Sequence, residues 1–238
     1  MASLMGPERA RYVRTMFARI APRYDLLNTV MTGGLDALWR RQAVAWAALP
    51  DGGTALDVGT GTGKLAIALA RSAPTAHVVG VDFTEPMLRL GARRARDLGL
   101  ERVRWVLGDA LALPFPPERF DCVVSAFTVR NVGNLALAFA EMARVTRPGG
   151  RVVCLEATPS GSGLVGAVAQ RYFRRAVPFL GQVLAGDREA YTYLPESVQQ
   201  FPDAEGLAAV MREAGLVRVQ YRVLGFGMVA LHLGWKPR

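Results

Sequence analysis

The sequence contains few of the residues that build metal centres or covalent cross-links. Among its 238 residues are two cysteines, Cys122 and Cys154, and two histidines, His77 and His232. The histidines are isolated, and the cysteines fall inside apolar runs that resemble strands. We therefore predict buried thiols in a reducing compartment, no disulfide framework and no metal site.

Long apolar runs are also missing, although 51% of the residues are hydrophobic. A membrane-spanning helix needs roughly 20 consecutive apolar residues, and no stretch reaches that length. Residues 1–9 lack the apolar run of a signal peptide. We expect a cytosolic or peripheral protein. The length suits one α/β domain over residues 1–238.

Lysine is almost absent, so arginine carries nearly all of the positive charge. Lys64 and Lys236 are the two lysines, and the formal net charge is +9. Such a balance permits nucleic acid, an anionic membrane or an acidic substrate as partner. The arginines are dispersed, and no basic stripe interleaved with aromatic residues occurs. We therefore expect no nucleic-acid partner.

Glycine, in contrast, is concentrated where an apolar strand ends. Residues 56–63 read LDVGTGTG, and a helix-like segment follows over 64–70. Glycine permits both a tight turn and the close approach of backbone N–H groups to a ligand that carries a nucleoside. The loop supplies five candidate cofactor-binding residues: Asp57, Gly59, Gly61, Thr62 and Gly63.

Three cofactors compete for this loop. A phosphate-binding Walker loop fails twice, because Val58 stands where its first glycine should be and Leu65 replaces its hydroxyl residue. A dinucleotide fingerprint fits loosely over residues 61–66, with an acid about twenty residues further on at Asp82. The D-x-G-x-G-x-G pattern resembles the S-adenosyl-L-methionine loop of class I methyltransferases. The loop alone leaves the last two alternatives open.

Acidic residues at the ends of the next two strands favour S-adenosylmethionine. Asp82 closes the apolar run 78–83, and its carboxylate suits the two ribose hydroxyls. Asp109 ends the next unit, where it can accept the adenine amino group while Ala110 offers its backbone N–H. These acids define a nucleoside site without a pyrophosphate site. Alternatively, each acid caps the following helix. Phe83 and Ser125 complete the candidate cofactor set.

The order of the elements predicts an α/β fold with a doubly wound sheet. Five strands near 54–58, 76–82, 102–108, 120–126 and 151–157 alternate with helices near 63–72, 84–98 and 134–146. A helix over 203–215 and strands over 217–224 and 228–235 follow. We expect a class I methyltransferase Rossmann-like fold, with a mostly parallel seven-stranded sheet and a C-terminal antiparallel hairpin. A helical preamble covers about 1–50, and an acceptor-side insertion covers about 158–200.

Several longer segments resemble one family over nearly the whole chain. They are 17–28 (FARIAPRYDLLN), 38–41 (LWRR), 127–132 (FTVRNV), 144–150 (RVTRPGG), 193–198 (YLPESV) and 227–234 (GMVALHLG). The sequence thus resembles the ubiquinone/menaquinone biosynthesis C-methyltransferases. The resemblance implies donor contacts at Thr62, Asp82, Asp109 and Ala110. It also implies methylation of a ring carbon of a reduced prenylated quinone, and demethylmenaquinol is the expected acceptor.

The sequence departs from this family at a few positions. The family usually has serine where Thr32 stands and histidine where Asp36 stands, and it often has serine at Ala126. Its second signature prefers other residues at Thr146, Arg147 and Thr158. None of these changes touches the expected donor site. Thr32 and Asp36 lie in the preamble, where they bear on the choice of acceptor.

Three residues are candidates for catalysis. Arg130 follows the strand end that faces the donor, and a guanidinium stays protonated, so we assign it to stabilise a phenolate oxyanion. Asn131 could share with it a water that carries the proton away, and Tyr24 could orient the ring. The alternatives are an Arg130 that ties its loop to a carboxylate and a Tyr24 that only packs.

Other functions remain to be weighed. The acceptor could be a benzoquinol or another membrane amphiphile such as a phospholipid amine. The loose dinucleotide fingerprint leaves a nicotinamide-dependent oxidoreductase, and a donor-binding protein without catalysis requires an idle Arg130. The expected partners are a prenylated quinol and a transient membrane surface. Because a prenyl tail stays in the bilayer, we expect a cytoplasmic protein that is peripheral at the inner face of the membrane. Self-association as a homo-oligomer is left open.

Overall fold

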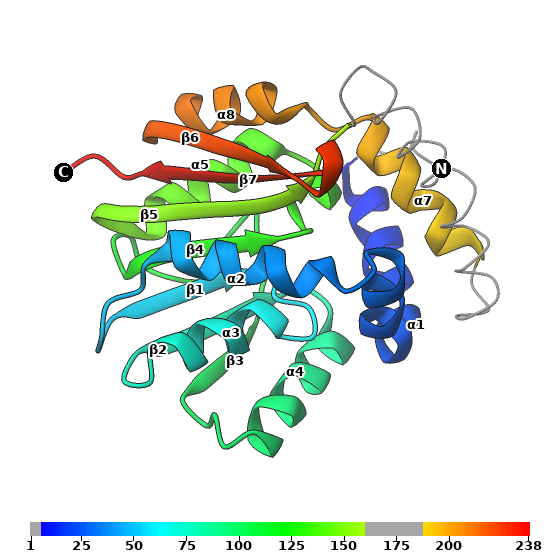
Figure 1. Ribbon diagram of the computed structural model, residues 1–238, viewed down its shortest axis with the longest axis horizontal. Helices are drawn as coiled ribbons and strands as arrows, with labels where there is room; N and C mark the ends of the chain where they lie inside the picture. Colours follow the sequence, from blue (N-terminus) through cyan, green and yellow to red (C-terminus); the bar gives the residue numbers. More distant parts are fainter. Residues whose placement is uncertain (1–5, 160–187) are drawn as a thin grey trace.

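A mixed sheet of seven strands forms the centre of the computed structural model, which describes residues 6–159 and 188–238 (Figure 1). The strands lie in the order β3-β2-β1-β4-β5-β7-β6, and β7 alone runs against its neighbours. Their bounds are β1 (Thr54–Val58), β2 (His77–Asp82), β3 (Val103–Leu107), β4 (Phe120–Ala126), β5 (Thr146–Ala157), β6 (Val217–Leu224) and β7 (Val229–Trp235).

Helices cover both faces of the sheet and one of its ends (Figure 1). One face carries α2 (Leu35–Ala47), α3 (Lys64–Ser72) and α4 (Glu85–Asp97), and the other carries α5 (Leu135–Val145) and α8 (Ala204–Glu213). The long α1 (Gly6–Met31) and α7 (Arg188–Gln199) cross the end at which the parallel strands finish. Two short 3-10 turns are η1 (Val129–Asn131) and η2 (Gly225–Gly227).

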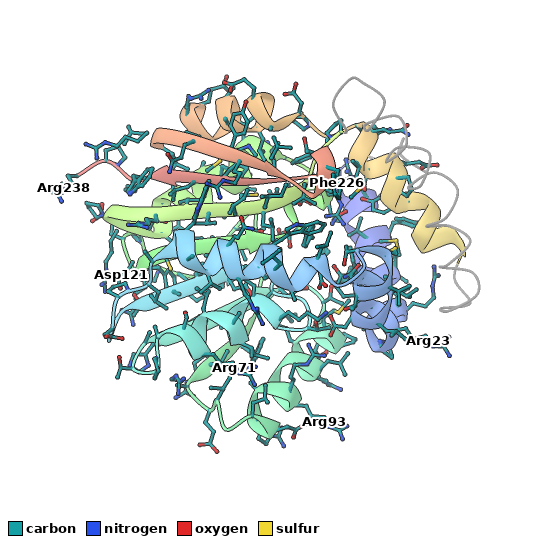
Figure 2. The ribbon with its side chains drawn as sticks, in the orientation of Figure 1. Arg23, Arg71, Arg93, Asp121, Phe226 and Arg238 are labelled. Atoms are coloured by element: carbon teal, nitrogen blue, oxygen red, sulfur yellow. The ribbon has the colours of Figure 1, made fainter. Side chains whose placement is uncertain are left out.

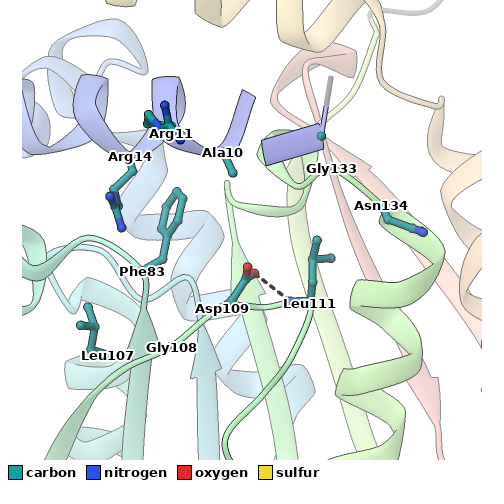
Figure 3. A pocket seen from close by; sticks show the side chains of 11 residues that line it. Ala10, Arg11, Arg14, Phe83, Leu107, Gly108, Asp109, Leu111, Gly133 and Asn134 are labelled. Carbon is teal, nitrogen blue, oxygen red and sulfur yellow. Dashed lines mark hydrogen bonds between the residues drawn. The ribbon is translucent and has the colours of Figure 1, made fainter. Parts of the chain in front are cut away.

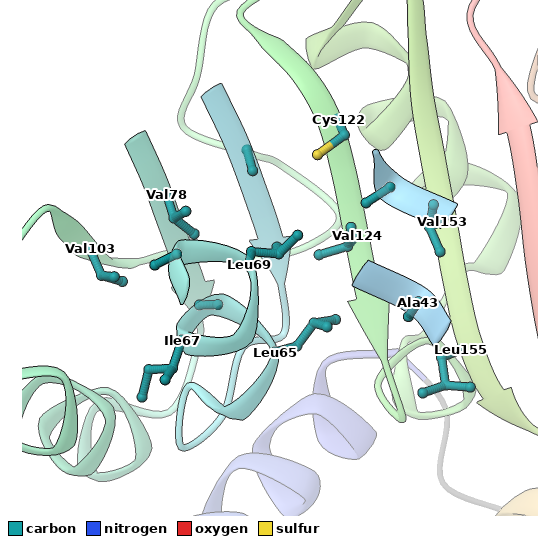
Figure 4. Close-up of a cluster of buried hydrophobic side chains, with 14 of the residues drawn as sticks. Ala43, Leu65, Ile67, Leu69, Val78, Val103, Cys122, Val124, Val153 and Leu155 are labelled. Atoms are coloured by element: carbon teal, nitrogen blue, oxygen red, sulfur yellow. The ribbon is translucent and has the colours of Figure 1, made fainter. Parts of the chain in front are cut away.

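The central strands are nearly continuous apolar runs because both of their faces are buried. On one face, Leu65 and Leu69 of α3 pack with Val124 and Val153 of the sheet (Figure 4). On the other face, α5 and α8 contribute a second cluster of buried side chains. The sheet is thereby fixed between two apolar layers, and the loops at its strand ends rest on a rigid base.

The predicted fold class is confirmed, including the reversed C-terminal strand. The predicted helical preamble forms α1 and α2. Cys122 and Cys154 are free and buried on β4 and β5, and burial raises the pKa of the Cys122 thiol to about 12. In the part of the chain that the structure describes, no three histidine, cysteine or acidic residues gather into a metal-binding group.

The start of β5 differs from the prediction. The strand begins at Thr146 and not near residue 151, because Thr146 pairs with Phe120 across a bulge. The Pro-Gly-Gly turn is drawn into the sheet as well: Gly149 N–H donates to Lys236 O, and Lys236 N–H donates to Gly150 O, both at 3.0 Å.

The predicted insertion is described only at its edges. Residues 160–187 lie outside the described residues, and the C-terminal part of the insertion forms α7. None of the helices in the described ranges combines the length and the apolar character that crossing a bilayer requires.

Candidate active site

The glycine loop between β1 and α3 is held in a conformation that larger residues could not adopt. Gly59 has φ +67°, and a Cβ there would lie 2.0 Å from Thr128. Gly63 has φ +77°, and its Cβ would lie 2.3 Å from the ring of Trp105, which also leaves no room for a Cβ at Gly91. Packing beneath the loop therefore imposes these glycines, whatever ligand lies above it.

Gly61 is the glycine that faces open space. It has φ +54°, no atom lies within 4 Å of where its Cβ would be, and it lines a cavity. A bound molecule can therefore approach this part of the backbone closely. This is the arrangement that a nucleoside-binding loop needs.

Asp57 and Ser125 shape the loop from beneath. One carboxylate oxygen of Asp57, Oδ2, accepts hydrogen bonds from Thr60 Oγ1 at 2.7 Å and Ala66 N at 3.0 Å. Burial raises the pKa of Asp57 to about 7, although these hydrogen bonds oppose the shift. Ser125 Oγ donates to Val58 O at 2.9 Å. Both side chains are buried and engaged with the protein, so their observed contribution is to the shape of the site.

Asp82 lies where the sequence predicts a ribose-binding carboxylate. Its Oδ2 accepts from Gly61 N and its Oδ1 from Thr84 N, each at 2.8 Å. Burial raises the pKa of Asp82, and these two N–H groups oppose the shift. A carboxylate oxygen accepts two hydrogen bonds, so each oxygen keeps capacity for one more. Asp82 also lines two cavities, which places that capacity at the candidate site.

A cavity of about 690 Å³ lies beside the ends of β2 and β3 (Figure 3). Its lining includes Phe83, Asp109 and Leu111 on one side and Ala10, Arg11 and Arg14 of α1 on the other. Asp109 Oδ1 accepts from Leu111 N at 2.9 Å, which leaves its second oxygen available. The volume falls within the range of roughly 300–1,000 Å³ that is typical of ligand pockets.

Two smaller cavities extend this space towards the glycine loop. One, of about 70 Å³, reaches Ala110, Asp82 and Asn131. The other, of about 50 Å³, is lined by Tyr24 of α1 together with Gly61, Asp82 and Asn131. The shared lining residues show that the cavities adjoin. The structure thus brings the predicted donor residues Asp82, Phe83, Asp109 and Ala110 next to the predicted acceptor residues Tyr24 and Asn131.

Arg130 forms a buried ion pair that the sequence prediction gave only as an alternative. Its Nη1 lies 2.5 Å from Glu156 Oε1, and its backbone N–H lies 3.3 Å from Glu156 Oε2. Burial alone would lower the pKa of the Arg130 guanidinium, but Glu156 and the phenols of Tyr24 and Tyr193 raise it overall. Arg130 is therefore a fixed cation, and among the described residues its Nε has no hydrogen-bond partner.

Tyr24 and Asn131 also offer polar atoms to the site. Burial raises the pKa of Tyr24, against the opposing effects of Arg130 and a hydrogen bond with the Asn28 side chain. The Tyr24 ring packs edge-on against Phe17 at 5.8 Å. Because its pKa is raised, Tyr24 stays protonated at neutral pH and can act as a hydrogen-bond donor.

Asn131 Nδ2 lies 3.5 Å from Phe127 O, and within the described ranges its Oδ1 accepts no hydrogen bond.

Thr62 has a partner that the sequence analysis missed. Thr62 Oγ1 donates to Asp25 Oδ1 at 2.9 Å, and Asp25 Oδ2 pairs with Arg94 at 2.5 Å. Arg94 also donates to Thr62 O at 3.1 Å, and Lys64 lies 3.5 Å from Asp25. Asp25 thus fastens α1 to the glycine loop. Its position directly after Tyr24 in a distinctive motif was the available signal.

A second group of charged side chains lies beside the glycine loop and contains Asp36, where the family that the sequence resembles usually has histidine. Asp36 is buried and pairs with Arg40 one turn further along α2. Lys64 at the start of α3 lies 3.4 Å from the same carboxylate. Arg40 also lies 5.4 Å from the centre of the Phe127 ring. These contacts connect α2 to the loops that surround the site.

The sheet order, the glycine loop and the acids at the ends of β2 and β3 together define a class I methyltransferase. A solved SAM-dependent methyltransferase from Thermotoga maritima shares this fold, with a TM-score of 0.65 and 21% identity over 93% of this chain and 98% of that one. The chain belongs to the ubiE/COQ5 methyltransferase family, whose match covers residues 5–236.

Sequence similarity to two relatives extends over nearly the whole chain. The demethylmenaquinone methyltransferase of Roseiflexus castenholzii is 48% identical over 229 residues, which is 96% of this chain and 95% of that protein. The demethylmenaquinone methyltransferase of Thermus thermophilus is 49% identical over 222 residues, which is 93% of this chain and all of that protein.

Proposed function

We propose that this protein methylates a ring carbon of a prenylated quinol, with S-adenosylmethionine as donor and demethylmenaquinol as acceptor. The observation that carries the proposal is the junction of two cavities at Asp82. One leads to Asp109 and Ala110, which are suited to a nucleoside, and the other leads to Tyr24; Asn131 lines both. The relatives named demethylmenaquinone methyltransferases support the choice of acceptor.

The residues at the junction fit the donor. Gly61 leaves room for close approach, and Asp82 has capacity for the two ribose hydroxyls. Asp109 and the backbone N–H of Ala110 are suited to the adenine edge. When bound, S-adenosylmethionine supplies an electrophilic methyl group. Asp57 and Ser125 keep the loop in the conformation that receives it.

On the acceptor side, the protein must favour the ionised form of the quinol. A phenol titrates near pH 10, so only about one in a thousand is ionised at pH 7. Arg130 is a permanent buried cation held by Glu156, and a lowering of the phenol pKa by about three units corresponds to roughly 4 kcal/mol. Arg130 cannot accept the proton itself, because a guanidinium does not deprotonate in a protein. A water held between Arg130 and Asn131 is our candidate carrier.

A prenyl tail confines the acceptor to the membrane, so the protein must meet it at the bilayer surface. We propose peripheral attachment from the cytoplasm, favoured by the net charge of +9. Arg23, Arg71, Arg93 and Arg238 lie at separate places on the molecule (Figure 2). Basic side chains are thus spread over the surface, so we expect the overall positive charge, and not one basic patch, to attract anionic lipid.

The proposal is tested by expressing the protein in a bacterium that lacks its own quinone C-methyltransferase and analysing the extracted quinones by mass. We expect menaquinone to replace demethylmenaquinone. The matched control is Asp82→Ala, a variant that we expect to have weakened donor affinity and therefore to produce less menaquinone. Accumulation of methylated benzoquinone alone would move the activity to the ubiquinone branch, and an unchanged quinone profile with folded protein would refute the proposal.

A further inference from the structure

The buried polar atoms that have no hydrogen-bond partner among the described residues include Arg130 Nε, Asn131 Oδ1 and the Tyr193 hydroxyl. The first two lie on η1, and Tyr193 lies on α7, the helix that contacts η1. An unpaired buried polar group destabilises a folded protein, so each such atom needs a physical explanation. Arg130 and Asn131 belong to the site described above. Tyr193 does not, and nothing in the proposed mechanism uses it.

Tyr193 is fixed in place from the apolar side. It lies on α7 with 6% of its surface exposed, and it belongs to the cluster of buried side chains that α1 contributes. Its ring centre is 5.9 Å from that of Tyr12. Figure 1 shows α7 running beside α1 at the end of the sheet, and both α1 and η1 have contacts with α7. The ring therefore has little freedom to turn its hydroxyl towards solvent.

The helix that carries Tyr193, α7, contacts η1, which carries Arg130, and Tyr193 is one of the groups that raise the pKa of Arg130. The other phenol near Arg130 is Tyr24, and its hydroxyl is already engaged with the Asn28 side chain. Of the two phenols, Tyr193 is thus the one that has no hydrogen-bond partner at all among the described residues. A phenol hydroxyl donates a hydrogen bond to an acceptor, and no described residue supplies that acceptor.

We propose that Tyr193 binds a hydroxyl oxygen of the acceptor ring and thereby sets its orientation; this rests on the proposed function. A quinol carries two oxygens on opposite sides of its ring. Arg130 stabilises the oxygen that ionises, and Tyr193 holds the other. Only a ring with oxygens at both positions satisfies both groups, so Tyr193 favours quinols over simple phenols.

The test is Tyr193→Phe, which removes one oxygen atom and keeps the ring. Because that oxygen is unpaired in the ligand-free protein, the variant should melt at the same temperature as the wild type or higher. The calorimetric Kd for S-adenosylmethionine should not change. KM for a short-chain demethylmenaquinol in detergent should rise about five- to 30-fold, with kcat little affected, as expected for one lost hydrogen bond. Tyr221→Phe, which removes an exposed hydroxyl on β6, is the matched control.

A second acceptor separates a binding role from a structural one. The corresponding naphthol keeps the ionising hydroxyl and lacks the opposite one, so the wild type should use it with a raised KM. Tyr193→Phe should show no further rise, because the contact is already missing. Equal KM values for the quinol in variant and wild type, or a further rise with the naphthol, would overturn the inference. A folded wild type that binds donor but methylates no quinol would refute the proposed function itself.

Discussion

At the scale of single residues, Asp57 links the shape of the glycine loop to pH. Burial gives its carboxyl a pKa of about 7 in the folded protein, whereas an unfolded aspartate titrates near pH 4. The folded state therefore holds the proton more tightly than the unfolded state. Stability that depends on Asp57 is present at low pH and is lost as the pH rises from about 4 to about 7.

Asp57→Asn should remove this loss. The same oxygen of Asp57 accepts both hydrogen bonds, and an amide oxygen can replace it. We compare the free energy of unfolding of Asp57→Asn with that of the wild type. This difference should favour the variant by about 2–3 kcal/mol more at pH 8 than at pH 5. Urea denaturation at both pH values measures it. Asp51→Asn, in an exposed turn, is the matched control. Parallel pH profiles for wild type and Asp57→Asn would assign the titration elsewhere.

Asp82→Ala should weaken donor binding by roughly thirty- to 150-fold in Kd, since up to two charge-assisted hydrogen bonds to ribose are lost. Part of that loss will come from the loop, because the carboxylate also holds Gly61 and Thr84. A lower melting temperature should accompany it. Calorimetry and thermal melting on the same preparation measure both effects, with the exposed Asp97→Ala as control. An unchanged titration would remove Asp82 from the site.

Arg130→Lys should damage turnover far more than donor affinity. Lysine can keep an ion pair with Glu156, but it lacks the planar group that can also present Nε to an oxyanion. We expect kcat and kcat/KM to fall together by roughly 10²–10³, the scale of a lost oxyanion donor. Single-turnover rates check this against Arg104→Lys, an exposed site on β3. Normal turnover in a folded variant would show that Arg130 only ties η1 to β5.

At the scale of elements, α1 is fastened to the glycine loop through Asp25. Asp25→Ala removes the contacts with Thr62 and Arg94, so α1 should cover the site less tightly. Hydrogen exchange in α1 should become faster, and the donor Kd should rise about three- to tenfold, as expected for about 1 kcal/mol. Asp51→Ala is the control, since it lies outside these contacts. Unchanged exchange in α1 would show that its apolar cluster alone holds it.

The strands and the face helices were predictable because their signals are local. β1, β2 and β4 are short apolar runs, and the helices between them keep helical spacing. The link from Asp25 to Arg94 spans 69 residues, and that from Arg130 to Glu156 spans 26. No local pattern in the sequence predicts either ion pair. The early start of β5 was missed for the same reason, since it depends on the pairing of Thr146 with Phe120 of β4 across a bulge.

At the scale of the whole molecule, the donor half of the site could be read from the sequence better than the acceptor half. Glycines and acids at successive strand ends meet at one edge of a parallel sheet, so their convergence follows from topology. The acceptor side is assembled from α1, η1 and α7, whose relative positions depend on side-chain packing. Tyr193 illustrates this. The sequence shows only an aromatic residue on a helix, and the structure is needed to show that its hydroxyl is buried without a partner among the described residues.

The spread of positive charge over the molecule predicts how it meets its substrate. Sedimentation with vesicles should increase with the fraction of anionic lipid and decrease as salt is added, because surface attraction is screened. Neutral vesicles are the control. If sedimentation did not change with salt or with lipid charge, the contact with the membrane would be purely apolar.

Methylation should require the reduced quinol, because the oxidised ring has no hydroxyl to ionise. Assays with the quinone and with the quinol measure this, and equal methylation of the two would overturn the phenolate mechanism.

The ring of Trp105 has a consequence for how this sequence can change over time. It fills the space that a side chain would need at Gly63 in the loop and at Gly91 in α4. Gly91 has no positive φ, so the main obstacle to alanine there is the indole, at 2.7 Å, while the Thr62 backbone lies 3.3 Å from the same point; Gly63 is also constrained by its positive φ. Substitutions at 91 and 105 should therefore be inherited together in descendants of this protein, as a smaller residue on β3 with a larger one on α4.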